Sequence, residues 1–321
     1  MKPAQEDNGI NKRLWETHSE LIRQFISLRP SCERLACEAS YILKKRLQEA
    51  KIEFSAVTCR AKTLDSFLEK LDGKTYGNLL EKITDLAGVR IVYLYSNDFE
   101  RIREIISKEF EVIEIVDKLR ERGVDKFGYL AVHFIVHLGD KSSGARYDDL
   151  KSLKCEIQVR TVLQDAWATI NHQLIYKQKQ DVLIPLIRKV NALAGVLETA
   201  DDQFNQVHLE SEQFRQVVES SLANDQGLNQ EINVDTVVAF LKNRFPDAER
   251  ESSEKYISKI LDNLDREKYK TLKDLKNLLD KKSDEIEKHK GMVLKNGKPS
   301  WSAAFILASV LEFERYGVSP K

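Results

Sequence analysis

Residues 155–161, with the sequence Cys-Glu-Ile-Gln-Val-Arg-Thr, constrain this chain more than any other stretch. Side chains of a β-strand alternate between its two faces, so the segment predicts a strand with both aliphatic residues on one face. The other face carries Glu156, Gln158 and Arg160. A carboxylate, an amide and a guanidinium on one face suit a site that holds a metal ion and phosphates. An edge strand with one solvated face has the same pattern, so the upstream segments decide between the two interpretations.

The composition favours a folded chain with no overall charge bias. With 321 residues, of which 42% are hydrophobic, the chain is long enough for one large domain or two ordinary ones. Lysine plus arginine and aspartate plus glutamate both total 51, so the overall charge predicts neither nucleic-acid nor membrane binding. Any site for anions must therefore be built locally.

The sequence gives no sign of export or membrane insertion. Residues 1–13 lack the apolar core of a signal peptide, and the uncharged run 299–311 is too short to span a bilayer. The four cysteines lack Cys-x-x-Cys spacing, which favours reduced thiols over a zinc site. We therefore expect a cytoplasmic protein with no membrane partner.

A group of basic residues begins at Arg60. Lys62, Ser66 and Lys70 are spaced four residues apart, which predicts that they line one side of a helix. Two ammonium groups and a hydroxyl next to a guanidinium are suited to clamping a polyphosphate. A solvated basic stripe is the alternative interpretation.

Two further predicted strands carry polar residues. In residues 83–94, Arg90 lies inside an apolar run with Asp85 just before it. A buried guanidinium is costly unless it is paired, so this arrangement favours a site over a surface position. In residues 127–137, the alternation places Tyr129 and His133 on one face, where they could stack on a base and hydrogen-bond to it. A core tyrosine and a histidine with a partner inside the protein are the alternative.

Helices dominate the rest of the chain. The other expected elements are a helix at 14–50 interrupted at Pro30, a strand at 52–58, a helix at 98–110 that Asp98 caps, a strand at 112–116, and helices at 162–177, 182–222 (broken near Pro185), 234–245, 253–265, 272–290 and 300–316. Residues 224–227 have the composition of a linker. We therefore predict two domains, at 1–223 and 228–321.

Five segments resemble motifs of the RelA/SpoT family of (p)ppGpp alarmone synthetases, in the family's order. They are Arg60-x-Lys62-x3-Ser66-x3-Lys70, Asp85-Leu-Ala-Gly-Val-Arg90, Gly128-Tyr129-x3-His133, Glu156-Ile-Gln-Val-Arg-Thr161, and Trp167-Ala168-x3-His172 with Tyr176-Lys177. The resemblance covers about residues 52–177. It implies an α/β fold, a mixed β-sheet flanked by helices like that of nucleotidyltransferases, followed here by an all-helical C-terminal region.

The resemblance also implies a reaction: transfer of the β,γ-pyrophosphate of ATP to the 3′-hydroxyl of GTP or GDP, with release of AMP. Such a transfer needs charge neutralisation and in-line positioning, for which Mg²⁺ is the implied cofactor. The metal ligands implied are Asp85 and Glu156, and Glu156 also lies where the family places the residue that takes the hydroxyl proton. The implied catalytic residues are Glu156, Asp85 and Arg90. The implied ATP-binding residues are Arg60, Lys62, Ser66, Lys70 and Arg90, and the implied GTP-binding residues are Tyr129, His133, Gln158, Arg160 and Asn171.

Two positions differ from the common family pattern on the acceptor side. Ala131 stands where serine is common, and Asn171 stands where many small synthetases have glutamate. We therefore expect GTP or GDP as acceptor, with weaker discrimination against adenine nucleotides than is usual in the family. The alternatives are another acceptor, such as ATP, ADP or the 3′ end of tRNA in a toxin-like enzyme, and a nucleotide-binding sensor without activity. No His-Asp pair occurs in the sequence, so the family's hydrolase activity is not predicted.

The C-terminal helices carry a predicted apolar stripe at Trp301, Phe305, Ile306 and Leu311. We expect either a stabilising role for this region or contact with a regulatory partner or a second copy of the chain.

Overall fold

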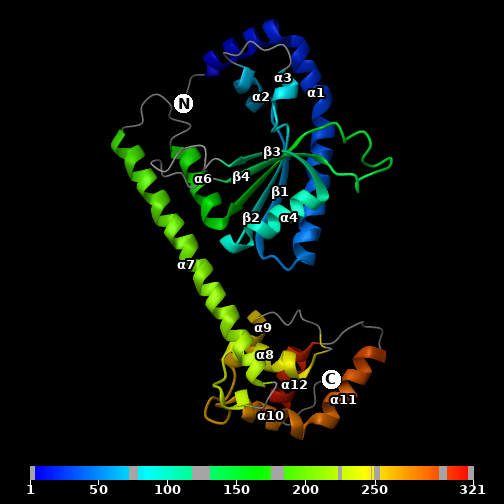
Figure 1. Ribbon diagram of the computed structural model, residues 1–321, viewed down its shortest axis with the longest axis vertical. Helices are drawn as coiled ribbons and strands as arrows, with labels where there is room; N and C mark the ends of the chain where they lie inside the picture. The colour runs from blue at the N-terminus through cyan, green and yellow to red at the C-terminus, as the bar shows by residue number, and fades with distance from the viewer. Residues whose placement is uncertain are drawn as a thin grey trace. The chain divides into compact units, whose positions relative to one another are not determined.

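In the computed structural model, five strands among the described residues form one mixed β-sheet (Figure 1). They are β1 (Phe54–Ala61), β2 (Ala87–Tyr93), β3 (Phe110–Asp117), β4 (Val132–Leu138) and β5 (Cys155–Thr161), in the spatial order β1-β2-β5-β4-β3. β2 and β5 pair in parallel, and the other neighbours pair antiparallel. The predicted α/β fold with a mixed sheet is confirmed.

The structure describes residues 4–71, 79–117, 131–174, 184–222, 226–246, 248, 254–295 and 302–316. The chain forms two compact units, Met1–Asn205 and Gln206–Lys321. None of the helices in this described part is both long and apolar enough to cross a bilayer.

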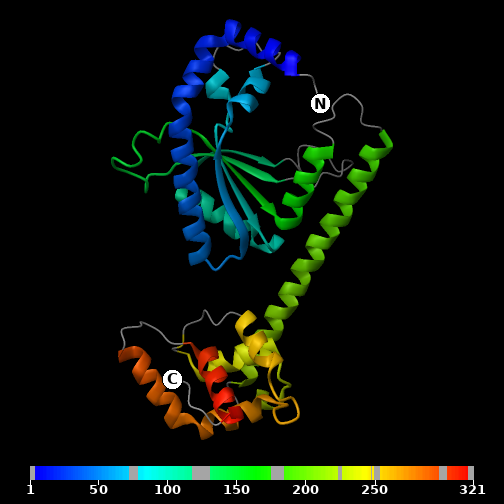
Figure 2. The same ribbon diagram turned by 180° about the vertical axis from the view of Figure 1, so that it is seen from behind.

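The two faces of the sheet differ in chemistry. On one face, Val89, Ile91, Phe134 and Ile157 are buried in the main core of the first unit, which also includes side chains of α1 (Ala4–Glu49) and α4 (Phe99–Glu109). The opposite face carries the polar residues of β2, β4 and β5 and packs against α6 (Val162–Leu174), so α1 and α6 lie on opposite sides of the sheet (Figure 1, Figure 2). The alternation of burial along β5 therefore follows from having one apolar and one polar face.

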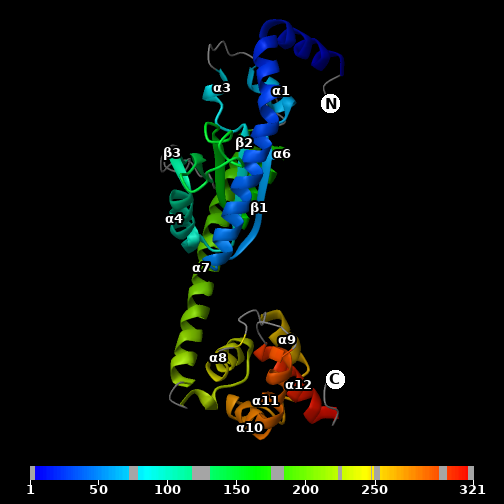
Figure 3. The ribbon, with the colours of Figure 1, turned by 90° about the vertical axis from the view of Figure 1, so that its right-hand side faces the viewer.

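Helix α1 runs alongside β1 and continues through Pro30 (Figure 3). The predicted interruption at Pro30 is wrong, and the backbone leaves helical geometry at His18 instead. A proline inside a helix removes one hydrogen bond and costs about 3 kcal/mol. Phe25 and Leu35, which lie on either side of Pro30, are almost fully buried, and their burial offsets that loss.

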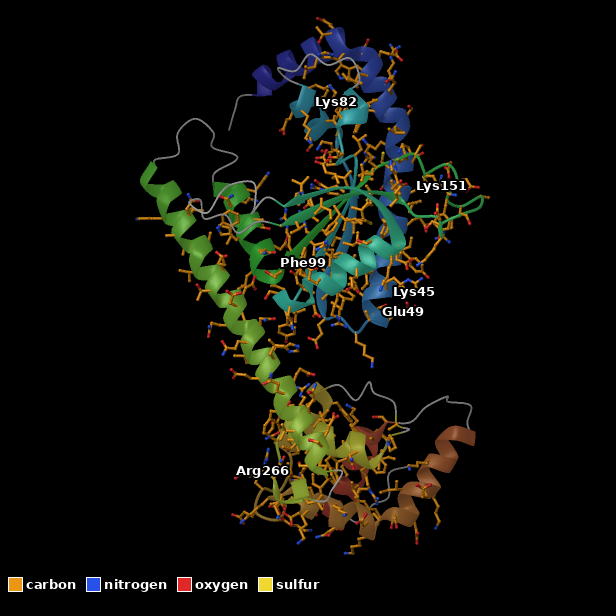
Figure 4. The ribbon with its side chains drawn as sticks, viewed as in Figure 1. Lys45, Glu49, Lys82, Phe99, Lys151 and Arg266 are labelled. Atoms are coloured by element: carbon orange, nitrogen blue, oxygen red, sulfur yellow. The ribbon has the colours of Figure 1, made fainter. Side chains whose placement is uncertain are left out.

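The segment that follows β4 is held against α1 by ion pairs. Residues 139–154, where Lys151 is labelled in Figure 4, are tied to α1 by ion pairs of Arg34 with Asp149 and of Arg146 with Glu38.

The short 3-10 helix η1 (Ser96–Asp98) leads into α4. Asp98 makes no side-chain capping bond there, contrary to the prediction, because its carboxylate pairs with Arg101.

The helices after β5 begin at strong local signals. Thr161 and Gln164 form a reciprocal cap, in which the Thr161 amide donates to the Gln164 side chain and the Gln164 amide donates to Thr161 Oγ1. The Thr161 hydroxyl in turn donates to Asp201 on α7 (Ile184–Leu222), which ties α7 to the end of β5. Pro185 lies in the first turn of α7, where proline is tolerated.

The second unit is helical, as predicted. It contains the end of α7, the 3-10 helix η3 (Gln226–Asn229), α8 (Val234–Arg244), α9 (Glu254–Asp262), α10 (Leu272–Lys281), α11 (Ser283–Lys295) and α12 (Ala303–Tyr316). Val218 and Leu222 of α7 belong to its core. The two compact units therefore meet after Asn205. The predicted domains, 1–223 and 228–321, are a different division of the chain and stay a prediction.

Two patterns read from the sequence are not helical faces in the structure. β1 extends to Ala61 and α2 (Leu64–Leu71) begins after Lys62, so Lys62 does not share a helix with Ser66 and Lys70. In α12, Phe305 is exposed whereas Ile306 is buried in the core, so the predicted apolar stripe does not lie on one face. Trp301, the first residue of that stripe, lies outside the described residues.

Candidate active site

The register of the sheet brings the predicted polar residues onto one face. The parallel pairing of β2 with β5 sets Gly88 opposite Glu156 and Arg90 opposite Gln158. The antiparallel pairing of β4 with β5 sets His133 opposite Gln158. Residues that are paired across a sheet point to the same side, so segments far apart in the sequence contribute to a single surface.

Glu156 is held between two side chains of this face. His133 Nδ1 lies 2.9 Å from its Oε1, and Gln158 Nε2 donates to its Oε2 at 2.8 Å. Burial acts to raise the pKa of the Glu156 carboxyl, but the hydrogen bonds from His133 and Gln158 bring that pKa below its ordinary value. Glu156 is therefore an ionised, largely buried carboxylate at neutral pH.

Asp85 lies just before β2 and accepts hydrogen bonds from two ammonium groups. Lys62 Nζ lies 2.8 Å from its Oδ2, and Lys70 Nζ lies 2.9 Å from its Oδ1. Burial acts to raise the pKa of Asp85, but the two lysines lower it overall. Two cations on one carboxylate leave an excess positive charge, which suits the binding of an anion.

The guanidiniums of Arg60 and Arg90 lie close enough to that of Arg160 to affect its pKa. Burial and the charge of Arg90 lower the pKa of Arg160, and Arg60 acts in the same direction. The Asp165 carboxylate contacts both Arg90 and Arg160, at 3.1 Å from Arg90 Nη1 and 3.6 Å from Arg160 Nη1. Within the described residues, the buried Nε atoms of both arginines have no hydrogen-bond partner, so these cations retain capacity for an anion.

Asp165 is the residue that the sequence interpretation missed. It lies in the first turn of α6, immediately after the reciprocal cap of Thr161 and Gln164. The capping pattern Thr-x-x-Gln was visible in the sequence, and a buried arginine requires an acidic partner. Together these two signals could have identified Asp165 as the partner of Arg160.

A small cavity opens between these groups. It has a volume of about 150 Å³ and is lined by Thr58, Cys59, Arg60, Asp85, Gly88, Val89, Arg90, Glu156 and Gln158. Pockets for drug-sized ligands measure about 300–1,000 Å³, so this space suits phosphate groups rather than a whole nucleotide. The cavity therefore brings both predicted metal ligands together with two of the predicted phosphate-binding residues.

The remaining predicted site residues do not line this cavity or lie outside the described residues. The Ser66 hydroxyl accepts a hydrogen bond from Thr63 Oγ1 at 3.0 Å. Arg160 Nη2 donates to Gln158 Oε1 at 3.0 Å, which links Arg160 to the Glu156 pair. Asn171 is half-buried on α6. Tyr129 lies outside the described residues, so its predicted role stays a prediction.

Comparison with known proteins identifies one family model that matches part of the chain. Residues 59–181 match the model of a region found in RelA / SpoT proteins, and this match contains all five motifs of the predicted resemblance. This segment of the chain is similar to that region of RelA / SpoT proteins. The predicted resemblance is therefore confirmed.

Two curated relatives come from Bacillus subtilis (strain 168). GTP pyrophosphokinase YjbM is 28% identical over 159 residues, covering 49% of this chain and 72% of the relative. GTP pyrophosphokinase YwaC is 25% identical over 150 residues, covering 45% of this chain and 69% of the relative. The prediction of an enzyme of the GTP pyrophosphokinase type is confirmed by these two relatives.

Among solved structures, small alarmone synthetase 1 from Bacillus subtilis bound to its product pppGpp is similar to this chain. The TM-score is 0.48 at 23% sequence identity, over 60% of this chain and 98% of that one.

Proposed function

We propose that this RelA/SpoT domain transfers the β,γ-pyrophosphate of ATP to the 3′-hydroxyl of GTP or GDP and releases AMP. The observation that carries the proposal is the position of Glu156, an ionised carboxylate on a sheet face that also carries Arg90 and Arg160. The names of the two curated relatives support this reaction class.

The basic residues of the site are assigned to the phosphates of ATP. Pyrophosphoryl transfer depends mainly on neutralising phosphate charge and on holding the reacting groups in line. Arg60 lines the cavity from the edge strand β1, and Arg90 lines it from β2. Lys62 and Lys70, now paired with Asp85, reach the same cavity through that carboxylate. Phosphate oxygens would take the place of part of these contacts.

Glu156 is assigned to the hydroxyl of the acceptor. Each oxygen of a carboxylate has a second lone pair, so Glu156 can accept the hydroxyl proton while His133 and Gln158 hold the carboxylate in place. Because the hydrogen bonds keep the pKa of Glu156 low, the carboxylate is ionised when the acceptor arrives. On the acceptor side, we assign Tyr129 to stacking on the base, with Asn171 as a polar neighbour.

Mg²⁺ is part of the proposal, and the residues present fit it. Asp85 and Glu156 line one cavity, and the charge of Asp85 acts to raise the pKa of Glu156, so the two carboxylates repel each other. Among the described residues, no cluster of three or more His, Cys, Asp or Glu side chains could hold a metal. Mg²⁺ commonly takes one or two carboxylates plus substrate phosphates, which matches this pair. When bound, Mg²⁺ supplies charge neutralisation at the transferring phosphates.

The helical second unit is proposed to regulate the synthetase or to contact a partner. Tyr256 on α9 is exposed and lines a cavity of about 810 Å³ together with Leu311 of α12. Exposed apolar groups beside such a cavity are typical of contact surfaces.

The reaction is tested with ATP labelled at the β-phosphate. Incubation with GTP or GDP should yield AMP and a labelled guanosine product, whereas a kinase would yield ADP. Glu156→Gln serves as the inactive control, since it keeps the shape of the side chain. Release of ADP, or no consumption of ATP with either acceptor, would overturn the proposal.

A further inference from the structure

We propose that Cys37 and Cys59 form a reversible disulfide that links α1 to β1 and lowers the activity of the neighbouring nucleotide site. The two Sγ atoms lie 3.3 Å apart, although the residues are 22 positions apart in the sequence. Both side chains are exposed, whereas Cys32 and Cys155 are buried. A pair of accessible thiols in contact across two elements serves no role in the proposed transfer.

The geometry of the Cys37–Cys59 pair and its position in the fold indicate which element a disulfide would move. A disulfide holds its sulfurs about 2.0 Å apart, so the two sulfurs must approach by about 1.3 Å. Cys37 lies on the long helix α1, beside Ala36 and near Ala39, both of which are buried in the core. Cys59 lies on β1, an edge strand that pairs only with β2 in the described sheet. Because β1 is held by strand pairing along one edge only, we expect it to move.

Movement of β1 would reach the nucleotide site directly. Alternation along the strand points the side chain of Cys59 toward α1, and Thr58 and Arg60 on either side of it line the cavity together with Cys59 itself. Drawing Cys59 toward α1 displaces Arg60, which is assigned to phosphate binding. This effect on turnover rests on the proposed function, whereas formation of the disulfide does not.

The oxidation is written with hydrogen peroxide as the oxidant. One thiolate attacks a peroxide oxygen, which gives a sulfenic acid and water, and the second thiol then displaces water to form the sulfur–sulfur bond. Overall, two thiols lose two electrons and two protons, and one peroxide becomes two waters. The hydrogen bond with Cys59 raises the pKa of Cys37 to about 11, so we assign the first step to Cys59 and the second step to Cys37.

The test treats the reduced full-length protein with hydrogen peroxide, alkylates it under denaturing conditions and maps the peptides by mass spectrometry. We expect one linked peptide pair, Cys37 with Cys59, with Cys32 and Cys155 alkylated. Cys37→Ser and Cys59→Ser should each abolish the link. Absence of a linked peptide in the wild type, or links between chains or to Cys32, would overturn the proposal.

The second measurement follows pyrophosphate transfer before and after oxidation. Turnover should fall by up to about 100-fold on oxidation, the scale expected when a substrate-positioning group moves by about an ångström, and should return with dithiothreitol. Cys37→Ser should keep its basal rate and lose the sensitivity to peroxide. A mapped disulfide with unchanged turnover would contradict the control of activity. No turnover in the reduced wild type would instead contradict the proposed function and leave the mapped disulfide standing.

Discussion

His133 Nδ1 lies 2.9 Å from Oε1 of Glu156, and a carboxylate can only accept, so the histidine donates. This contact joins β4 to β5 at the carboxylate to which the proposed chemistry is assigned. From the sequence, His133 was predicted to bind the acceptor. In the structure it contacts Glu156, so it can act on the reaction by holding that group.

Removing the charge of either cavity carboxylate should stop the reaction. Glu156→Gln and Asp85→Asn keep the shape of each side chain, and each should lower turnover at least about 100-fold, the scale of losing a main acid–base or electrostatic contributor. Circular dichroism should show an unchanged fold. Near-normal turnover of Glu156→Gln would remove the basis for its assigned role.

His133→Ala should move the pH dependence of the reaction. The hydrogen bond from His133 lowers the pKa of Glu156, while burial of the carboxyl acts to raise it. Without the hydrogen bond the pKa rises, so Glu156 becomes protonated at a higher pH as the pH falls. The acid limb of kcat/KM should therefore shift to higher pH. A profile that falls in overall height with no shift would indicate that His133 only supports the fold.

Asp165→Asn tests whether Asp165 positions the paired arginines. A hydrogen bond to a charged group contributes about 1.5–3 kcal/mol, so KM for ATP should rise about tenfold or more, with a smaller change in kcat. Glu100→Gln is the matched control, because Glu100 and Arg103 form an exposed ion pair on α4 at the same distance of 3.1 Å. Equal effects of the two substitutions would rule out a specific role for Asp165.

Shortening the chain tests the role proposed for the second unit. A chain that ends after Asn205 keeps the contacts of the first unit, whereas one that ends after Leu222 leaves Val218 and Leu222 without the core that buries them. We expect the shorter chain to be the more soluble of the two and to show an altered transfer rate. The readouts are gel filtration and steady-state kinetics. Kinetics, self-association and partner binding identical to those of the full chain would argue against regulation.

Much of the fold was predictable because its periodicities are local. The alternation in β5 and the helical spacing of the second unit both appear in the structure. The continuity of α1 through Pro30 was not predictable, because it depends on tertiary burial that outweighs a local preference. The stripe of Lys62, Ser66 and Lys70 failed because β1 extends further than its propensities suggest.

The sequence indicated several residues that the structure brings to one cavity, but it did not indicate how they pair. The motifs indicated Glu156 and Asp85, but the sequence does not state the register of β4 against β5, which sets His133 beside Glu156. Lys62 and Lys70 were predicted to hold phosphate, and both contact Asp85 here. Sequence spacing cannot show such a contact, because it is made between separate elements.

The choice of acceptor tests the central claim most directly. The protein is supplied with ATP labelled at the β-phosphate, together with equal amounts of GTP, GDP and deacylated tRNA, and the labelled products are separated. We predict label on the guanosine nucleotides and release of AMP, with a lesser amount of labelled pyrophosphate transferred to adenine nucleotides. Label found only on tRNA would contradict the assignment of a guanine nucleotide as acceptor, and absence of AMP would contradict pyrophosphate transfer itself.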